Sequence, residues 1–158
     1  MKQWTINDFQ REFEQDEHYT CSTYTAGVKI DGGIVRINMQ LENCEPNDQA
    51  QYISTTASQH INWIVSNIEN ICTHLAGKMT SLANDWAEEG EITAEEFKER
   101  VQLEAIRISA TGESDANIPI EDGNLILYFY DDDIFAGHAI ELWIHKDYVL
   151  DDDPTIAG

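Results

Sequence analysis

A cluster of carboxylates closely followed by a histidine is the part of this chain whose residue types and spacing come nearest to a chemical site. Its members form one short stretch: Asp131, Asp132, Asp133, Phe135, Gly137 and His138. Carboxylate oxygens and an imidazole nitrogen can coordinate a divalent cation or pass a proton to a substrate. The stretch is therefore the candidate binding region. Within it, Asp133 and His138 are weak candidates for a metal site, or for the partner and base of a hydrolase.

The simpler interpretation of His138 is structural. It shares the parity of Ile140, which predicts that its ring points toward the core and donates a hydrogen bond to a backbone carbonyl or a nearby aspartate. We favour this interpretation, because metal sites usually show closer His and Cys spacing. A divalent ion would also need a further ligand such as Asp151, which requires the last loop to fold back on this region.

Two apolar segments flank the cluster and predict an antiparallel β-hairpin. Residues 125–130 are apolar on both parities, which is typical of a strand covered on both faces. From His138 to Ile144 apolar and polar residues alternate, which predicts the second strand. Trp143 lies on the polar parity of that strand and is a candidate aromatic anchor for a partner.

The motifs of the common enzyme mechanisms are missing from the chain. It contains no Gly-x-Ser-x-Gly elbow, and Asp31-Gly32-Gly33 lacks the lysine and the spacing of a phosphate-binding loop. The three cysteines have neither the spacing of a zinc site nor the basic surroundings of a nucleophile, which predicts reduced thiols: Cys21, Cys44 and Cys72. We expect a non-catalytic protein without a cofactor.

The charge balance narrows the range of partners. The 158 residues include 30 Asp and Glu but 9 Lys and Arg, a formal net charge of −21 at pH 7. Such a surface disfavours nucleic acids and anionic membranes and attracts basic proteins, although solubility alone would also account for it. The start of the chain lacks the apolar segment of a signal peptide, and no apolar run approaches the ~20 residues of a membrane span. We therefore expect a cytoplasmic protein.

Short elements are predicted at the N-terminus. Apolar residues recur at helical spacing between Ile6 and Phe13, after a cap at Thr5 or Asn7, which predicts a short first helix. Two alternating segments then flank the glycines at residues 32 and 33 and predict an antiparallel hairpin.

A long helix is predicted in the middle of the chain. From Pro46 the apolar residues follow a helical period to Trp86, which predicts one long helix, or two helices with a kink near Gly77. His60 and His74 lie near the edges of this apolar stripe, where we expect boundary residues rather than a metal pair.

The following segment begins with a second helix start. Thr93 and Glu96 form a capping box, which predicts a short helix. Residues 101–110 then predict a strand, and a slip in its alternation between Ala105 and Ile106 predicts a bulge. Residues 111–123 predict a loop, and residues 155–158 a final contact at the sheet edge.

Together these elements predict one domain over residues 1–158 with an α+β fold. Its antiparallel sheet has about five to six strands, made of the N-terminal hairpin and the C-terminal strands. The long central helix or helix pair covers this sheet on one side.

Several motifs of residues 80–158 occur in one order: Asn84-Asp85-Trp86, Thr93-x-x-Glu96-Phe97, Leu103-Glu104-x-Ile106, Asp131-Asp132-Asp133, Phe135-x-Gly137-His138-x-Ile140 and Ile156-Ala157-Gly158. In this order the segment resembles a bacterial family of domains of unknown function, marked by an acidic strand end followed by Phe-Trp-Gly-His. Ala136 stands where that motif has Trp. The resemblance implies a fold, and relatives that act as immunity proteins against contact-delivered toxins imply a binding role.

We therefore expect an acidic, non-catalytic binding protein, an immunity or inhibitor protein that neutralises a basic partner such as a toxin. The alternative is a metal-dependent or carboxylate/His hydrolase with its site near Asp133 and His138. The sequence does not indicate an oligomeric state.

Overall fold

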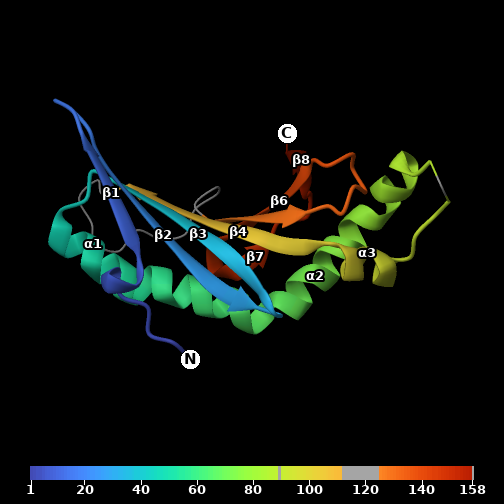
Figure 1. Cartoon of the computed structure of the whole chain (residues 1–158), viewed down its shortest axis with the longest axis horizontal. Coiled ribbons are helices and arrows are strands. Elements are labelled where there is room, and N and C mark those ends of the chain that lie inside the picture. Colours follow the sequence, from blue (N-terminus) through green and yellow to red (C-terminus); the bar gives the residue numbers. More distant parts are fainter. Residues whose placement is uncertain (89, 112–124, 158) are drawn as a thin grey trace.

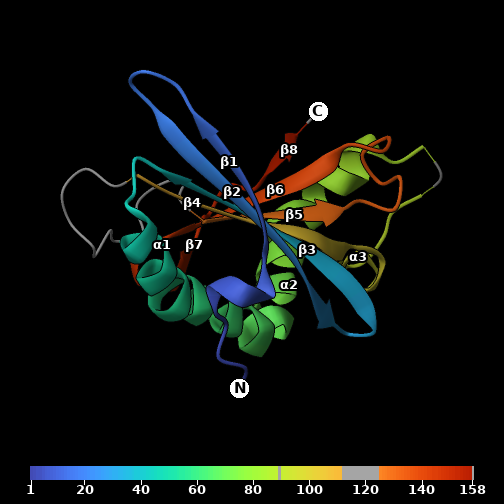
Figure 2. The same ribbon diagram turned by 60° about the vertical axis from the view of Figure 1, so that its left-hand side comes forward.

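A computed structural model describes residues 1–88, 90–111 and 125–157. In this described part of the chain, a helical layer lies against one face of a strongly twisted sheet, and no helix lies on the other face (Figures 1 and 2). The described strands are β1 (Gln10–Gln15), β2 (Thr20–Ile30), β3 (Gly33–Glu42), β4 (Gln102–Thr111), β5 (Leu125–Tyr130), β6 (Ala139–His145), β7 (Val149–Leu150) and β8 (Thr155–Ala157). The α+β fold with helices on one side of the sheet is confirmed.

The sheet is larger than predicted, and it is mixed. Its eight described strands follow the order β1-β2-β3-β4-β5-β6-β7, and β8 pairs with β6. All pairs are antiparallel except β3 and β4, which run parallel. The long helical segment between these two strands explains this exception, because a helical crossover brings the chain back to the same edge and allows the next strand to run in the same direction.

The expected first helix is wrong beyond its first turn. A 3-10 turn, η1 (Ile6–Asp8), begins at Thr5, whose backbone N–H donates to the Asp8 carboxylate at 2.8 Å. The chain then enters β1, which pairs along its whole length with β2, from Gln10 opposite Thr25 onward. Backbone hydrogen bonding to β2 therefore outweighs the helical spacing of the apolar residues, and Phe13 is 50% exposed.

The predicted hairpin of β2 and β3 is confirmed. Ile30 pairs with Gly33, so the turn consists of Asp31 and Gly32. Both residues have positive φ, 50° and 83°, as a two-residue turn matched to the strand twist requires.

The central helix is continuous from Pro46 to Trp86 and bends along its course (Figure 1). It consists of α1 (Pro46–Tyr52), a π-helical turn η2 (Ile53–Ala57) and α2 (Ser58–Trp86). The α-helical hydrogen-bond pattern is therefore interrupted at the π-turn and not at the predicted position, Gly77, where α2 is continuous. None of the helices in the described part of the chain is long and apolar enough to cross a membrane.

The third helix, α3 (Ala94–Arg100), begins at the predicted capping box. The Glu96 backbone N–H donates to the Thr93 hydroxyl at 3.2 Å, and the Thr93 backbone N–H donates to the Glu96 carboxylate at 3.3 Å. The following strand β4 has its register shift between Leu103 and Ala105, slightly before the predicted position. Of the loop predicted at 111–123, residues 112–123 lie outside the described residues, and Thr111 ends β4.

The core lies between α2 and the central strands. Its strand residues alternate along the chain and are at most 4% exposed: Ile37, Met39, Leu41, Ile106, Ile108, Ala110, Leu125, Leu127, Phe129, Ile140, Leu142 and Ile144. On the other face of β5, Ile126 is buried, Tyr128 is half-buried and Tyr130 is 41% exposed. The prediction that both faces of this strand are covered is therefore only partly right, because no helix covers the second face (Figure 2).

The two helix histidines differ from the expectation in different ways. His60 is 4% exposed, which is a core position rather than a boundary, and its Nδ1 lies 2.7 Å from the hydroxyl of Tyr148 in η3 (Lys146–Tyr148). Burial lowers the pKa of His60 to about 4. His74 is half-buried, and its Nε2 lies 2.8 Å from the Asp151 carbonyl oxygen.

Candidate functional site

The loop between β5 and β6 is built around the carboxylate of Asp131. This side chain is 1% exposed and accepts hydrogen bonds from three backbone N–H groups of its own loop. The donors are Asp133 at 3.2 Å, Phe135 at 2.9 Å and Gly137 at 3.0 Å. A buried carboxylate needs such partners, and this one satisfies donors that a tight loop would otherwise leave unpaired. Asp131 therefore shapes the loop and has little capacity left for a ligand.

The same loop contains an unusual run of left-handed backbone. Asp132, Asp133 and Ala136 have φ values of 49°, 60° and 58°, and Gly137 has 83°. Only the glycine adopts this region without a steric cost. The Asp131 hydrogen bonds hold the three other residues there, and such strained residues are concentrated at functional sites in proteins.

Asp132 is paired within the chain. Its carboxylate accepts from the Arg100 Nε at 2.9 Å, and its carbonyl accepts from an Arg100 Nη at 2.8 Å. The two side chains are 48% and 39% exposed, so this pair contributes little to stability on its own. It ties the end of α3 to the loop and neutralises the Asp132 carboxylate.

Phe135 and His138 both meet the Trp86 ring in T-shaped contacts. Phe135 is fully buried, with its ring centroid 5.6 Å from Trp86 and 6.4 Å from Phe97. His138 is half-buried, and its ring meets Trp86 at 6.5 Å and an angle of 86°. Among the described residues the His138 ring has no hydrogen-bond partner, so the expected carbonyl or aspartate acceptor is replaced by an aromatic contact.

Asp151 lies at the other end of β6. Its carboxylate is 3.1 Å from the Nε2 of His145, and its carbonyl contacts His74. The last loop therefore folds back on the helix and not on the acidic loop, so Asp151 does not join Asp131 and His138. In the part of the chain that the structure describes, no group of three or more His, Cys, Asp or Glu side chains is placed to hold a metal ion.

Trp143 is also separate from the acidic loop. It is 37% exposed on the sheet face that carries no helix, and its Nε1 donates to Glu141 at 3.1 Å. The Tyr128 hydroxyl donates to the same carboxylate oxygen at 3.4 Å. Of the predicted site residues, the structure thus keeps the loop residues together and places Trp143 elsewhere.

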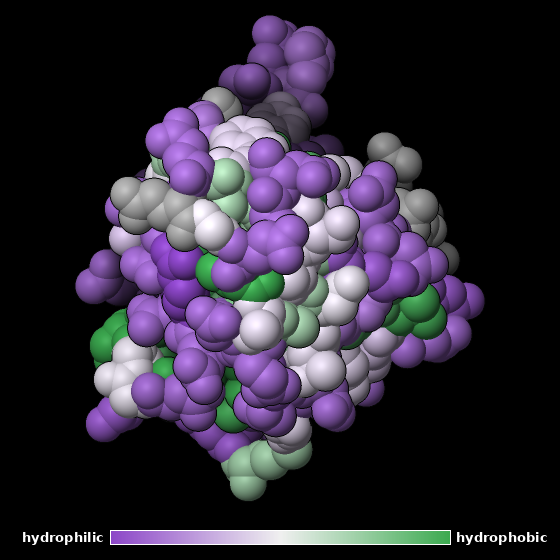
Figure 3. All heavy atoms as spheres, turned by 90° about the vertical axis from the view of Figure 1, so that its right-hand side faces the viewer, coloured by the Kyte–Doolittle hydropathy of each residue, from purple (hydrophilic) through white to green (hydrophobic). Residues whose placement is uncertain are grey.

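A cleft of about 570 Å³ opens beside the acidic loop, between the end of α2, the connection that follows it, the last residue of α3 and the loop itself. Its described lining residues are Ala83, Trp86, Ala87, Glu88, Gly90, Ile92, Arg100, Asp133, Ile134 and Ala136. This end of the molecule has a mostly hydrophilic surface with small separate hydrophobic patches (Figure 3). The sequence pattern identified Asp133 as a site residue but not Trp86, Glu88 or Arg100. These three residues lie far from the acidic loop in sequence and meet it only in the fold.

The wall of the cleft opposite the acidic loop is also held by a side chain. The amide of Asn84 accepts from the Ile92 backbone N–H at 2.8 Å and donates to the Ile92 carbonyl at 3.1 Å. This bidentate contact closes the connection between α2 and α3. Both walls of the cleft are therefore fixed by hydrogen bonds to backbone groups, which favours a preformed cleft.

Comparison with known proteins identifies the family of the chain but no activity. No curated protein and no solved structure matches it. The family described as "Uncharacterized protein conserved in bacteria" (DUF2262) matches residues 11–152. This match extends well beyond the segment that carries the motifs, so the chain belongs to this bacterial family.

Proposed function

We propose that this protein is a non-catalytic acidic binding protein that holds a basic protein partner, as an immunity or inhibitor protein holds a toxin. The observation that supports this most directly is the uncompensated negative charge beside the cleft. Arg100 is the cation of the described cleft lining, and its charge is directed at Asp132. The carboxylates of Asp133 and Glu88 have no ion-pair or hydrogen-bond partner among the described residues.

The charge balance of the whole chain supports the same proposal. Four of the nine basic residues form ion pairs with acidic residues within the described part of the chain: Lys2, Lys78, Lys98 and Arg100. A chain with a net charge of −21 attracts a cationic protein over distances of about 10 Å at moderate salt. The electrostatic field would chiefly accelerate association with such a partner.

The arrangement of the acidic loop also favours binding over chemistry. Asp131 is committed to backbone N–H groups, and Asp132 is committed to Arg100. Asp133 remains available, on a backbone that these contacts hold in place. A preorganised acidic surface loses little conformational entropy when a partner docks.

The test begins with the immobilised protein and a lysate of its source bacterium, and the captured proteins are identified by mass spectrometry. Any candidate is then purified, and its association rate is measured at several salt concentrations. We expect a basic protein whose association rate falls about tenfold or more between low and physiological salt. Capture of neutral or acidic proteins alone, with rates independent of salt, would contradict the proposal.

A pair of matched variants locates the contact. Asp133→Asn with Glu88→Gln removes two charges beside the cleft, and Glu12→Gln with Glu14→Gln removes two exposed charges on β1. The strand β1 and the end of α2 lie at opposite ends of the molecule (Figure 1). We expect the cleft variant to lower the association rate more than the β1 variant. Equal effects would assign the attraction to net charge rather than to this surface.

A further inference from the structure

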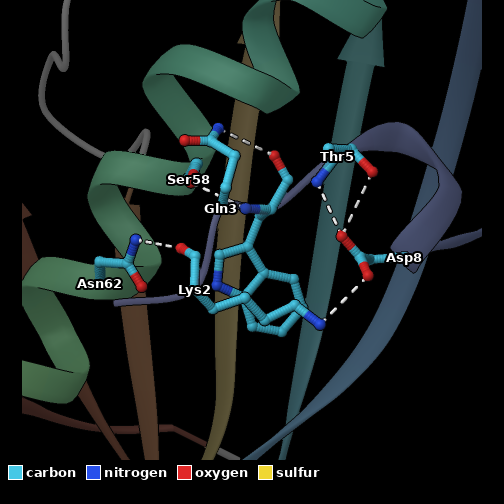
Figure 4. Close-up of polar contacts among 7 residues, drawn as sticks. Lys2, Gln3, Thr5, Asp8, Ser58 and Asn62 are labelled. Carbon is cyan, nitrogen blue, oxygen red and sulfur yellow. Dashed lines mark hydrogen bonds and ion pairs between the residues drawn. The ribbon is translucent and has the colours of Figure 1, made fainter.

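Near the N-terminus the chain contains a complete binding arrangement for a cation. The Lys2 Nζ lies 4.5 Å from the centroid of the Trp4 ring and 3.1 Å from the Asp8 carboxylate (Figure 4). An ammonium or guanidinium is attracted by an aromatic face and by a carboxylate at once. The Thr5 backbone N–H and the Lys2 ammonium both lower the pKa of Asp8, which keeps this carboxylate charged.

The cleft also combines carboxylates with an aromatic ring, and the cation of its described lining, Arg100, is directed at Asp132. Trp86 is 44% exposed and lines the cleft together with the carboxylates of Asp133 and Glu88. Neither neighbouring ring stacks on Trp86, because Phe135 and His138 meet it at 82° and 86°. No Lys or Arg in the described part of the chain lies over this ring, unlike Lys2 over Trp4.

We infer that the cleft binds the guanidinium of an arginine side chain of the basic partner. This inference rests on the proposed function. Trp86 would contact the planar face of the guanidinium, and Asp133 and Glu88 would accept its N–H groups. The 570 Å³ of the cleft exceeds what one side chain needs, so the residues around the arginine would enter as well.

Arginine fits this cleft better than lysine for two reasons. A guanidinium is planar and weakly hydrated, so it stacks on an indole while its edge donates to carboxylates. It also has enough N–H groups to reach two carboxylates, whereas an ammonium is a strongly hydrated point charge. Arg100 does not fill this role, because its Nε and one Nη are directed at Asp132.

The probes for the test are N-acetyl-arginine amide and N-acetyl-lysine amide, added to the full-length protein. The readout is the indole N–H signal of each tryptophan by NMR. We expect the Trp86 signal to shift saturably with arginine amide, with a dissociation constant on the order of 1 mM, and about fivefold more weakly with lysine amide. Equal affinities would overturn the assignment to arginine, and the absence of a saturable Trp86 shift would overturn the inference.

Variants separate the cleft from the rest of the surface. Asp133→Asn with Glu88→Gln should weaken arginine amide about tenfold, whereas Glu12→Gln with Glu14→Gln should leave its affinity unchanged. Ala136→Trp should block the cleft sterically, because Ala136 lines it on a backbone held by Asp131. An affinity that survives this block would place the arginine elsewhere.

The failure of this inference can be told apart from the failure of the proposed function. If arginine amide does not bind while a basic protein still associates in a salt-dependent manner, the function stands and the cleft is not its arginine site. If arginine amide binds as expected and no basic protein associates, the cleft is an arginine site and the proposed function is wrong.

Discussion

Each end of the central helix has a tryptophan close to a carboxylate, but the tryptophan is buried at one end and partly exposed at the other. At one end, which we call the pinned end, residues 2–8 lie against η2 and the start of α2, and Trp4 is 4% exposed. At the other end, the cleft end, Trp86 is 44% exposed beside Asp133 and Glu88. At the pinned end the chain supplies its own cation, Lys2. The difference indicates that one tryptophan serves stability and that the other is available to a partner.

Hydrogen bonds to the helix hold the N-terminal segment over the pinned end. The π-helical turn η2 interrupts the α-helical hydrogen-bond pattern near this end, because its backbone bonds run from i to i+5. The N-terminal segment is hydrogen-bonded to this part of the helix: the Gln3 amide donates to the Ser54 carbonyl of η2, and the Asn62 side-chain amide of α2 donates to the Lys2 carbonyl at 2.7 Å. At the cleft end, α2 ends at Ala87, whose backbone is extended, and Trp86 remains 44% exposed beside Phe135 and His138.

The strongest test of this comparison replaces the buried tryptophan of the pinned end and, as a control, an exposed tryptophan elsewhere. Trp4→Ala should lower the free energy of unfolding by roughly 3–5 kcal/mol, because it empties a buried site in contact with Phe9. Trp143→Ala is the matched control on the exposed face of β6 and should cost less than about 1 kcal/mol. Urea denaturation measures both values, and similar losses would mean that burial does not distinguish these positions.

The next largest effect should come from the carboxylate that shapes the cleft end. Asp131→Ala leaves three backbone N–H groups without their acceptor and should lower the free energy of unfolding by roughly 3 kcal/mol. Asp133→Ala is the control, since its carboxylate has no described partner, and should change stability by less than about 0.5 kcal/mol. Equal and small changes in urea denaturation would show that the loop does not depend on Asp131.

A pH-dependent loss of stability should arise from His60, near the pinned end. The pKa of this histidine is lowered to about 4 in the folded state from an ordinary value of 6.5. Between pH 6.5 and 4 the unfolded state therefore binds a proton that the folded state does not, so stability falls as the pH falls and levels off below about 4. The contribution is roughly 2–3 kcal/mol at pH 4 relative to pH 7.

The measurement compares variants, because the many carboxylates titrate in the same range. His60→Asn keeps a polar group near the Tyr148 hydroxyl and should remove the His60 contribution to the difference in unfolding free energy between pH 7 and pH 4.5. His18→Asn changes an exposed histidine and should leave that difference as in the original protein. If His60→Asn retained the full pH dependence, the burial of His60 would not be its cause.

The sequence predicted those features that depend on local patterns. The β2–β3 turn, the capping box at Thr93 and the alternation of β6 are each specified by residues within a few positions of one another. Features that depend on distant pairing were missed. β1 is a strand because β2 offers it a free edge, and the cleft exists because the loop after β5 meets the end of α2. In the sequence, Trp86 therefore looks like the last residue of an apolar helix stripe, whereas in the structure it lines the cleft.

The smallest predicted effect concerns a single hydrogen bond at the pinned end. The Trp4 backbone N–H donates to the Ser58 hydroxyl at 3.1 Å in a buried site (Figure 4). Ser58→Ala leaves that N–H unsatisfied, which costs about 1 kcal/mol, but alanine also favours the helix by a few tenths of a kcal/mol. Ser66→Ala, at an exposed position of the same helix, brings the gain in helix propensity without removing this hydrogen bond. The difference between the two variants in urea denaturation should thus be about 1 kcal/mol. A difference near zero would mean that this hydrogen bond does not help to hold the N-terminal segment, and the closure of the pinned end would then rest on the buried Trp4 ring and on the Gln3 and Asn62 contacts.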